Sequence, residues 1–123
     1  MPPIRVTSST SLTARAATAL LKNRLLALDA NDGFIHCTAI LKPIGVSIDD
    51  ADADALIGCD TPASGIQELT ASKAIALNAS VYVTAAGKVT DTQAGSAIAY
   101  GIAIQAAGAD GDIIPVLPAP QYV

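Results

Sequence analysis

Residues 78–89 read NASVYVTAAGKV, and this stretch decides the fold because its pattern occurs twice in the chain. Residues 23–35, NRLLALDANDGFI, repeat the same order of Asn, apolar run, Gly-containing turn and apolar run. Turns built from Asn, Asp and Gly accept the backbone angles that a tight reversal needs, so they are typical of β-hairpins. Each copy therefore predicts a strand, a turn and a second strand.

The similarity between the two copies continues beyond the hairpins. Residues 99–104, AYGIAI, match residues 43–48, PIGVSI, and both alternate apolar and small residues around a central glycine. A glycine inside a short strand indicates a bend or the close approach of another backbone. The copies are offset by about 55 residues, and the predicted pseudo-repeats span about 20–60 and 75–118.

Short strands separated by Gly, Asp and Pro turns predict an all-β fold. We expect a small β-barrel or sandwich built from two pseudo-repeated halves, with at most one short helix. Residues 69–77, between the halves, are the expected site of that short helical turn. The segment 12–28 is ambiguous because good helix formers fill much of it, but we assign a strand to residues 24–29, directly before the turn.

The domain organisation follows from length and from the lack of a hydrophobic face near the N-terminus. A chain of 123 residues fits one domain and buries enough surface without a metal or disulfide. Residues 1–11 contain two prolines and a run of Ser and Thr, so we interpret them as an extended arm. Residues 12–123 are predicted to form a single β domain.

Composition excludes several classes of function. Aromatic residues make up only 3%, which leaves few platforms for stacking sugars or bases. The net charge of −4 argues against a nucleic-acid partner. No apolar run is long enough for a membrane span, and residues 1–10 lack the apolar core of a signal peptide, so we expect no membrane partner and synthesis in a cytoplasm.

The cysteines and the single histidine do not predict a metal centre. Cys37 and Cys59 form no CxxC pair, and His36 cannot complete the four ligands of a zinc site. We interpret the cysteines as small buried thiols. Because no nucleophile elbow or phosphate-binding loop is present either, we predict no enzymatic activity, no catalytic residue and no cofactor.

An aspartate cluster has the spacing that opens an EF-hand calcium loop, at Asp50, Asp52 and Asp54. That loop also needs a Gly at its sixth position and a bidentate Glu at its twelfth. The chain has Ala55 and Thr61 there, so we predict a solvated turn and no metal site.

Charge is distributed unevenly, since four basic residues precede the first acid, Asp29. The asymmetry fits either a solvated surface or a basic N-terminal arm directed at an acidic partner. Within the arm, Ile4, Arg5 and Val6 alternate as an added strand requires, with Ile4 and Val6 on one face. We predict that these three residues bind a partner by extending a sheet. The alternative is that the arm covers its own barrel or a neighbouring copy.

Four segments together resemble a known family of proteins. Residues 81–90 (VYVTAAGKVT), 97–103 (AIAYGIA), 108–116 (GADGDIIPV) and 42–47 (KPIGVS) are similar to the capsid cement, or head decoration, proteins of tailed bacteriophages. The similarity covers roughly residues 20–118. These motifs are turns and strands that determine a fold, and Tyr100 replaces the small residue usual before Gly101.

The resemblance implies a structural virion protein. Such a protein is expected to form a homotrimer on the capsid exterior, to bind the major capsid protein and to bridge neighbouring subunits, after synthesis in the host cytoplasm. The alternative is a carbohydrate-binding or adhesin-type β module on a virion surface, against which the shortage of aromatic residues counts.

Overall fold

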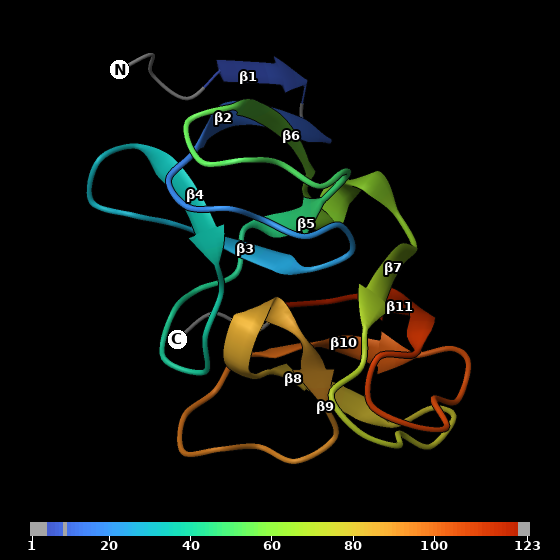
Figure 1. Ribbon diagram of the computed structural model, residues 1–123. Coiled ribbons are helices and arrows are strands. Elements are labelled where there is room, and N and C mark those ends of the chain that lie inside the picture. The colour runs from blue at the N-terminus through green and yellow to red at the C-terminus, as the bar shows by residue number, and fades with distance from the viewer. Residues whose placement is uncertain (1–4, 9, 121–123) are drawn as a thin grey trace.

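The computed structural model of the chain describes residues 5–8 and 10–120, which form two β-rich halves stacked on each other (Figure 1). The first half contains β1 (Arg5–Ser8), β2 (Ser11–Ala16), β3 (Leu25–Leu28), β4 (Gly33–His36), β5 (Gly45–Ser47) and β6 (Leu56–Asp60). The second half contains β7 (Gln67–Thr70), β8 (Ser80–Val83), β9 (Val89–Thr90), β10 (Ala99–Ala103) and β11 (Ile113–Pro118). Two single 3₁₀ turns complete the described elements, η1 (Pro62–Ser64) and η2 (Ala85–Gly87). The predicted all-β fold is confirmed.

The first half is a closed barrel of five strands with β1 added at one edge. Its strand order is β1-β2-β4-β3-β5-β6, and β6 also pairs with β2, which closes the ring. The β2–β4 contact is parallel and joins Arg15 with Gly33 and Ala16 with Phe34, whereas the other pairings are antiparallel. Closure leaves β1 as the edge strand of this half.

The second half repeats this topology strand for strand. Its order is β7-β11-β10-β8-β9, and an isolated parallel bridge from Ala71 to Val89 brings the two ends of the sheet together. That bridge corresponds to the β2–β4 contact of the first half. Another isolated bridge, Ile75 to Ala107, corresponds to Leu20 to Ala51. The predicted internal repeat is therefore a pair of small barrels.

Equivalent glycines allow two strands to approach closely in each barrel. A Cβ added to Gly45 would lie 2.2 Å from the carbonyl oxygen of Asp60, and one added to Gly101 would lie 2.2 Å from that of Leu117. Both distances are far below van der Waals contact, so only glycine fits. Of the alternatives left open by the sequence, the close approach of a backbone is found at both positions, and the pairing of β10 with β8 is also irregular between Ala99 and Gly101.

Two hydrophobic clusters fill the molecule. The first barrel encloses Leu26, Phe34, Ile57 and Cys59 with small residues around them. The cluster of the second barrel extends into the junction between the barrels, where it includes Leu25, Ala27, Cys37 and Val46 of the first half. Strand β3 thus contributes Leu26 to one core and its neighbours to the other. Burial on both sides of β3 joins the barrels into one packed body.

Hydrogen bonds at the junction fix the linker between the barrels, residues 61–66, which joins β6 to β7. The side-chain nitrogen of Gln67 donates to the carbonyl oxygens of Asp60 and Thr61, at 2.8 and 2.9 Å. The side-chain oxygen of Gln67 accepts from the hydroxyl of Tyr100, which is fully buried. Tyr100 therefore satisfies a buried amide that fixes the linker.

The turn η2 of the second barrel contacts the first barrel directly. The Gly87 N–H donates to the carbonyl oxygen of Cys37 at 2.8 Å, and an Arg24 guanidinium nitrogen donates to the carbonyl oxygen of Ala86 at 3.0 Å. Thr70 donates to the carbonyl oxygen of Asn23 through both its N–H and its hydroxyl. These bonds cross the junction and resist rotation of one barrel against the other.

Two local expectations differ from the structure. The helical turn expected over residues 69–77 is wrong, because Gln67–Thr70 is strand β7 and the next residue, Ala71, bridges to β9. The ambiguous segment 12–28 holds strand β2 as well as β3, although Ala, Leu and Arg favour a helix there. Pairing with β6 overrides that local preference. None of the helical segments in the described part of the chain has the length and hydrophobicity needed to cross a membrane.

Candidate interaction surfaces

The edge strand β1 is the first surface on which a partner could bind. It pairs with β2 in the same chain, with Arg5 opposite Thr13 and Val6 opposite Leu12. It stands at the end of the strand order, at the top of Figure 1 and far from the second barrel. An edge strand carries backbone N–H and C=O groups that another strand can pair with.

The predicted binding residues fall on this strand only in part. Arg5 and Val6 belong to β1, whereas Ile4 lies outside the described residues. For residues 5–8 the structure shows pairing with the chain's own barrel, the alternative that the sequence left open. Binding of a partner by Ile4, Arg5 and Val6 stays a prediction.

A second surface, which sequence reasoning missed, lies on the second barrel. Ile102 of β10 and Leu117 of β11 are opposite each other, and both are partly exposed. The exposed residues Ile104 and Ile113 belong to the same two segments. The sequence of β11, IIPVLP, could have predicted this surface, because the side chains on both faces of the strand are apolar. An antiparallel sheet with one face in water normally has polar residues at the outward positions.

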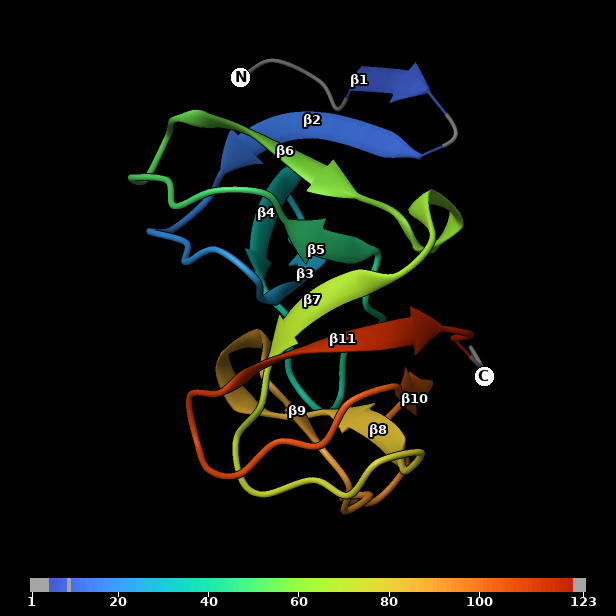
Figure 2. The same cartoon turned by 90° about the vertical axis from the view of Figure 1, so that its right-hand side faces the viewer.

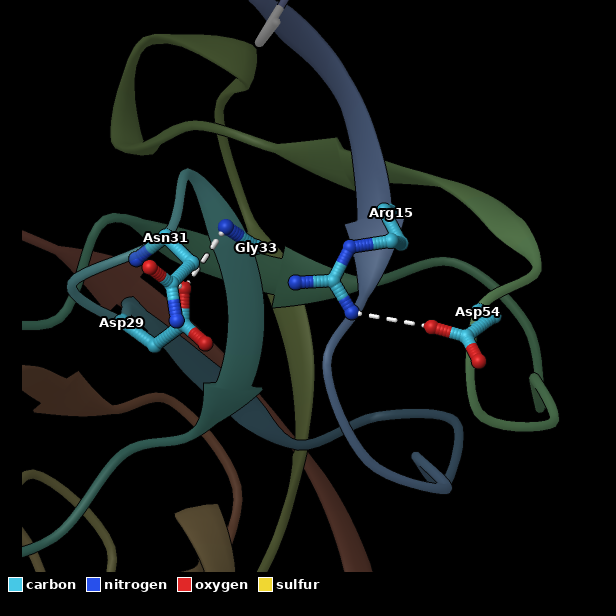
Figure 3. A network of polar contacts seen from close by, with 5 residues as sticks. All are labelled: Arg15, Asp29, Asn31, Gly33 and Asp54. Atoms are coloured by element: carbon cyan, nitrogen blue, oxygen red, sulfur yellow. Dashed lines mark hydrogen bonds and ion pairs between the residues drawn. The ribbon is translucent and has the colours of Figure 1, made fainter. Parts of the chain in front are cut away.

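Several charged side chains of the described residues form structural contacts. Arg15 forms an ion pair with Asp54 at 3.0 Å (Figure 3), so one member of the aspartate cluster closes a turn against β2. Asp50 accepts a hydrogen bond from the Lys22 N–H at 2.7 Å. Asp52 is exposed. The aspartate cluster is therefore part of a surface loop, and two of its members stabilise that loop.

The side chain of Asp29 organises the first hairpin turn. Its carboxylate accepts from the N–H groups of Asn31 and Gly33, at 3.0 and 2.8 Å (Figure 3). An aspartate that binds backbone groups two and four residues ahead stabilises a turn locally. The equivalent turn of the second barrel is η2, and it is held by the junction instead.

Burial determines the chemistry of the histidine and the cysteines. Burial and then the charge of Arg24 lower the pKa of His36, whose Nε2 accepts a hydrogen bond from the Leu21 N–H at 3.0 Å. Burial raises the pKa values of Cys37 and Cys59 to about 12. A thiol is reactive only as the thiolate, so both cysteines are inert packing residues at neutral pH.

Metal sites and sites for flat ligands depend on metal-binding groups and exposed aromatic side chains. Among the described residues there is no group of three His, Cys, Asp or Glu side chains that could hold a metal ion. Phe34 and Tyr100 are fully buried, and Tyr82 is partly exposed. The described residues therefore provide an edge strand and an apolar face, and both features suit contacts with other protein chains.

The described residues form two fused small barrels with an edge strand and an exposed apolar face, and comparison with known families gives the class of this protein. The model of the phage cement protein family matches residues 4–118. The chain belongs to the phage cement protein family. Membership gives it a structural role associated with the phage capsid, as a component of the virion.

Comparison with solved structures supports the fold. The crystal structure of the head fiber gp8.5 N base of bacteriophage phi29 is similar, with a TM-score of 0.76 and 22% sequence identity. The similarity covers 89% of this chain and 92% of that one, and at this identity it concerns the fold alone. No curated protein matches the sequence.

Proposed function

We propose that the protein is a cement protein that binds the outside of the phage head and bridges neighbouring major capsid subunits. The observation that carries the proposal is the family match over residues 4–118. The arrangement of the two barrels supports it, because the junction makes one packed body and β1 lies at one end of it. A rigid body with contact surfaces far apart can link two neighbours.

The proposed mechanism is multivalent binding by a homotrimer. Three linked copies that engage several capsid subunits gain affinity without a large interface at each contact. A protein that binds only the assembled lattice also stabilises the lattice by mass action, in the same way as a ligand that binds only the native state. In this proposal the chain acts through contacts and not through chemistry.

We propose that β1 supplies the contact with the capsid. A strand of the major capsid protein would pair with the outer edge of β1, and Ile4, Arg5 and Val6 would determine the fit of its side chains. Arg5 would attract an acidic region of the capsid, a contribution that salt weakens.

The test uses expanded heads that lack the protein. We expect removal of residues 2–8 to lower binding to heads at least about tenfold, the equivalent of 1.4 kcal/mol. Sedimentation of heads with bound protein measures the loss, and the resistance of decorated heads to heat measures bridging. We expect Arg5→Glu, which retains the strand, to weaken binding most at low salt.

The control for the truncation is its own thermal melt and oligomeric state. If the truncated protein melts and associates as the full chain does, and still decorates heads with unchanged affinity, β1 is not the anchor. If the full chain binds heads without making them more resistant to heat, the bridging role is wrong.

A further inference from the structure

The outward positions of β10 and β11 in the second barrel form a continuous apolar strip. On β10 and the residue after it these positions are Ile102 and Ile104, and on β11 they are Ile113, Pro115 and Leu117. Ile102 is opposite Leu117, and the Ile104 N–H donates to the carbonyl oxygen of Pro115 at 3.1 Å. The side chains therefore lie in adjacent rows across two hydrogen-bonded strands.

The strip continues toward the junction between the barrels. Gln67 is opposite Val116, so Ile66 comes next to Leu117 on the outer face. Ile66 is 60% exposed and Leu117 is 47% exposed. Figure 2 views the side where β7 and β11 cross the front of the molecule. A shallow groove of about 260 Å³ follows toward the first barrel, and besides Ile48 and Ile66 it is lined by charged residues, among them Lys22, Asp60 and Glu68, so it forms a polar border of the strip.

The first barrel serves as an internal control for this strip. In the shared topology Asp60 takes the place of Leu117 and Gly58 that of Pro115, because Asp60 pairs with Val46 as Leu117 pairs with Ile102. The first barrel thus has Asp and Gly at these two outward positions, although it has exposed apolar residues at two others, Leu56 in the place of Ile113 and Ile48 in the place of Ile104. The apolar side chains of Pro115 and Leu117 are therefore not required by the fold, and they indicate a contact.

The strip is large enough for the centre of a stable interface. Two neighbouring strands about 4.8 Å apart, over roughly five residues of about 3.3 Å each, give an apolar face of roughly 10 by 17 Å. Ile66 extends this face, and the exposed Glu68, opposite Pro115 on β7, borders it. A polar rim around it would complete the roughly 800 Å² per partner of a standard interface.

We propose that this strip is the surface through which copies of this chain associate with each other. The outward positions of β10 and β11 carry no charge, and permanent interfaces between identical chains are the ones with apolar, uncharged centres. If this strip stayed exposed between synthesis and capsid binding, the protein would aggregate. In the proposal a second copy covers the strip as soon as the chains fold, and β1 remains available to bind the capsid. The proposal rests on the self-association in the proposed function and not on capsid bridging.

The test replaces strip residues by Asp, the residue that the first barrel has in the place of Leu117. Leu117→Asp gives position 117 the side chain that position 60 already has, and Ile102→Asp with Leu117→Asp places charge in both strands. Ile40→Asp is the matched control, because Ile40 is 89% exposed and lies in the loop after β4. Sedimentation equilibrium of the full chain measures the mass, and circular dichroism checks the fold.

We expect the wild type and Ile40→Asp to form the same oligomer and the double variant to be a folded monomer. Leu117→Asp alone should raise the dissociation constant at least about tenfold, so the proposal stays testable if the double variant fails to fold. Amide hydrogen exchange at 102–104 and 113–117 should become faster in the variants.

Two results would overturn the proposal. One is a wild-type chain that is monomeric at every concentration, and the other is a strip variant that keeps the wild-type mass. Head binding is measured separately on the same proteins. An oligomer that resists the strip substitutions contradicts this surface alone, whereas an oligomer that fails to bind heads contradicts the capsid function alone.

Discussion

Strands β3 and β8 occupy the same place in the two barrels, yet their surroundings differ. In β3, Leu25 and Ala27 are buried against the second barrel, while Leu26 fills the first. In β8 the positions equivalent to Leu25 and Ala27 are Ser80, which is exposed, and Tyr82, which is partly exposed. The side chains that point into a barrel thus form its core, and those that point outward determine whether another barrel can pack against it. At these two positions the second barrel therefore has an exposed Ser and a partly exposed Tyr, where the first barrel has a buried Leu and a buried Ala.

The largest expected effect concerns what the barrels share. Gly101→Val should destabilise the fold by about 4 kcal/mol or more, because the new side chain would displace the Leu117 carbonyl of the neighbouring strand. Gly45→Val should be equally severe, since the Asp60 carbonyl is equally close. Chemical denaturation measures both losses.

Asp52→Ala is the control for the glycine pair, because Asp52 is exposed and should change stability by less than about 0.5 kcal/mol. A Gly101 variant as stable as the Asp52 variant would show that the strands can separate without loss. Unequal effects at the two glycines would show that the barrels are not equivalent in what holds them closed.

The turns before β4 and β9 differ in what surrounds them. Asp32 and Gly87 are equivalent and both have positive φ, at 60° and 72°. A Cβ on Gly87 would lie 2.4 Å from the Leu25 carbonyl oxygen in the junction, whereas the turn of Asp32 is exposed. We expect Gly87→Asp to cost about 3 kcal/mol and Asp32→Gly to change stability by less than about 1 kcal/mol.

Thermal melts of the two swapped variants measure this asymmetry, and a variant that carries both changes tests additivity. If Gly87→Asp and Asp32→Gly lower the melting temperature by similar amounts, the positive backbone angle alone determines the cost of substitution and the junction contributes nothing. A small loss for Gly87→Asp would mean that the junction yields to the added side chain, so the barrels would be less firmly joined than the hydrogen bonds of η2 imply.

The sequence predicted those parts of the fold that depend on local chemistry. The turn at Asp29 forms from its own carboxylate and nearby N–H groups, so its residues suffice to predict it. Strand β2 was not predicted, because SLTARA has the composition of a helix and its partner β6 is more than 40 residues away in the chain. Closure of each barrel depends on such distant pairings and left no local signal.

The interaction surfaces were predicted less well for a related reason. Alternation within the N-terminal arm predicted an added strand, and β1 is a strand, but its pairing with β2 was only one of the alternatives. Both sets of side chains in β11 are apolar, yet a sequence does not show which set faces outward. Only the register with β10 separates Val116, which is buried, from Leu117, which is exposed.

The smallest expected effect concerns one more pair of equivalent positions, His36 and Asp91. The pKa of His36 is lowered by burial and by Arg24, whereas the pKa of Asp91 is lowered chiefly by its hydrogen bond and ion pair with Lys73. A lowered folded pKa means that the unfolded chain binds the proton more readily, so stability falls as pH falls. For His36 the loss begins near the ordinary pKa of about 6.5. For Asp91 the loss of stability begins only near the ordinary pKa of a carboxyl group.

Because His36 is the single histidine, a loss of stability between neutral pH and about pH 5 should belong to it. Protonated Nε2 cannot accept the Leu21 N–H, and the loss of that hydrogen bond should amount to on the order of 1 kcal/mol or less. His36→Gln retains an acceptor and does not titrate, so its denaturation midpoint should stay level over this range. Asp91→Asn should leave the slope between neutral pH and pH 5 unchanged. If stability still falls with pH in His36→Gln, another group causes the loss. If the pH dependence disappears only in Asp91→Asn, the titrating group is Asp91 of the second barrel and not His36 of the first.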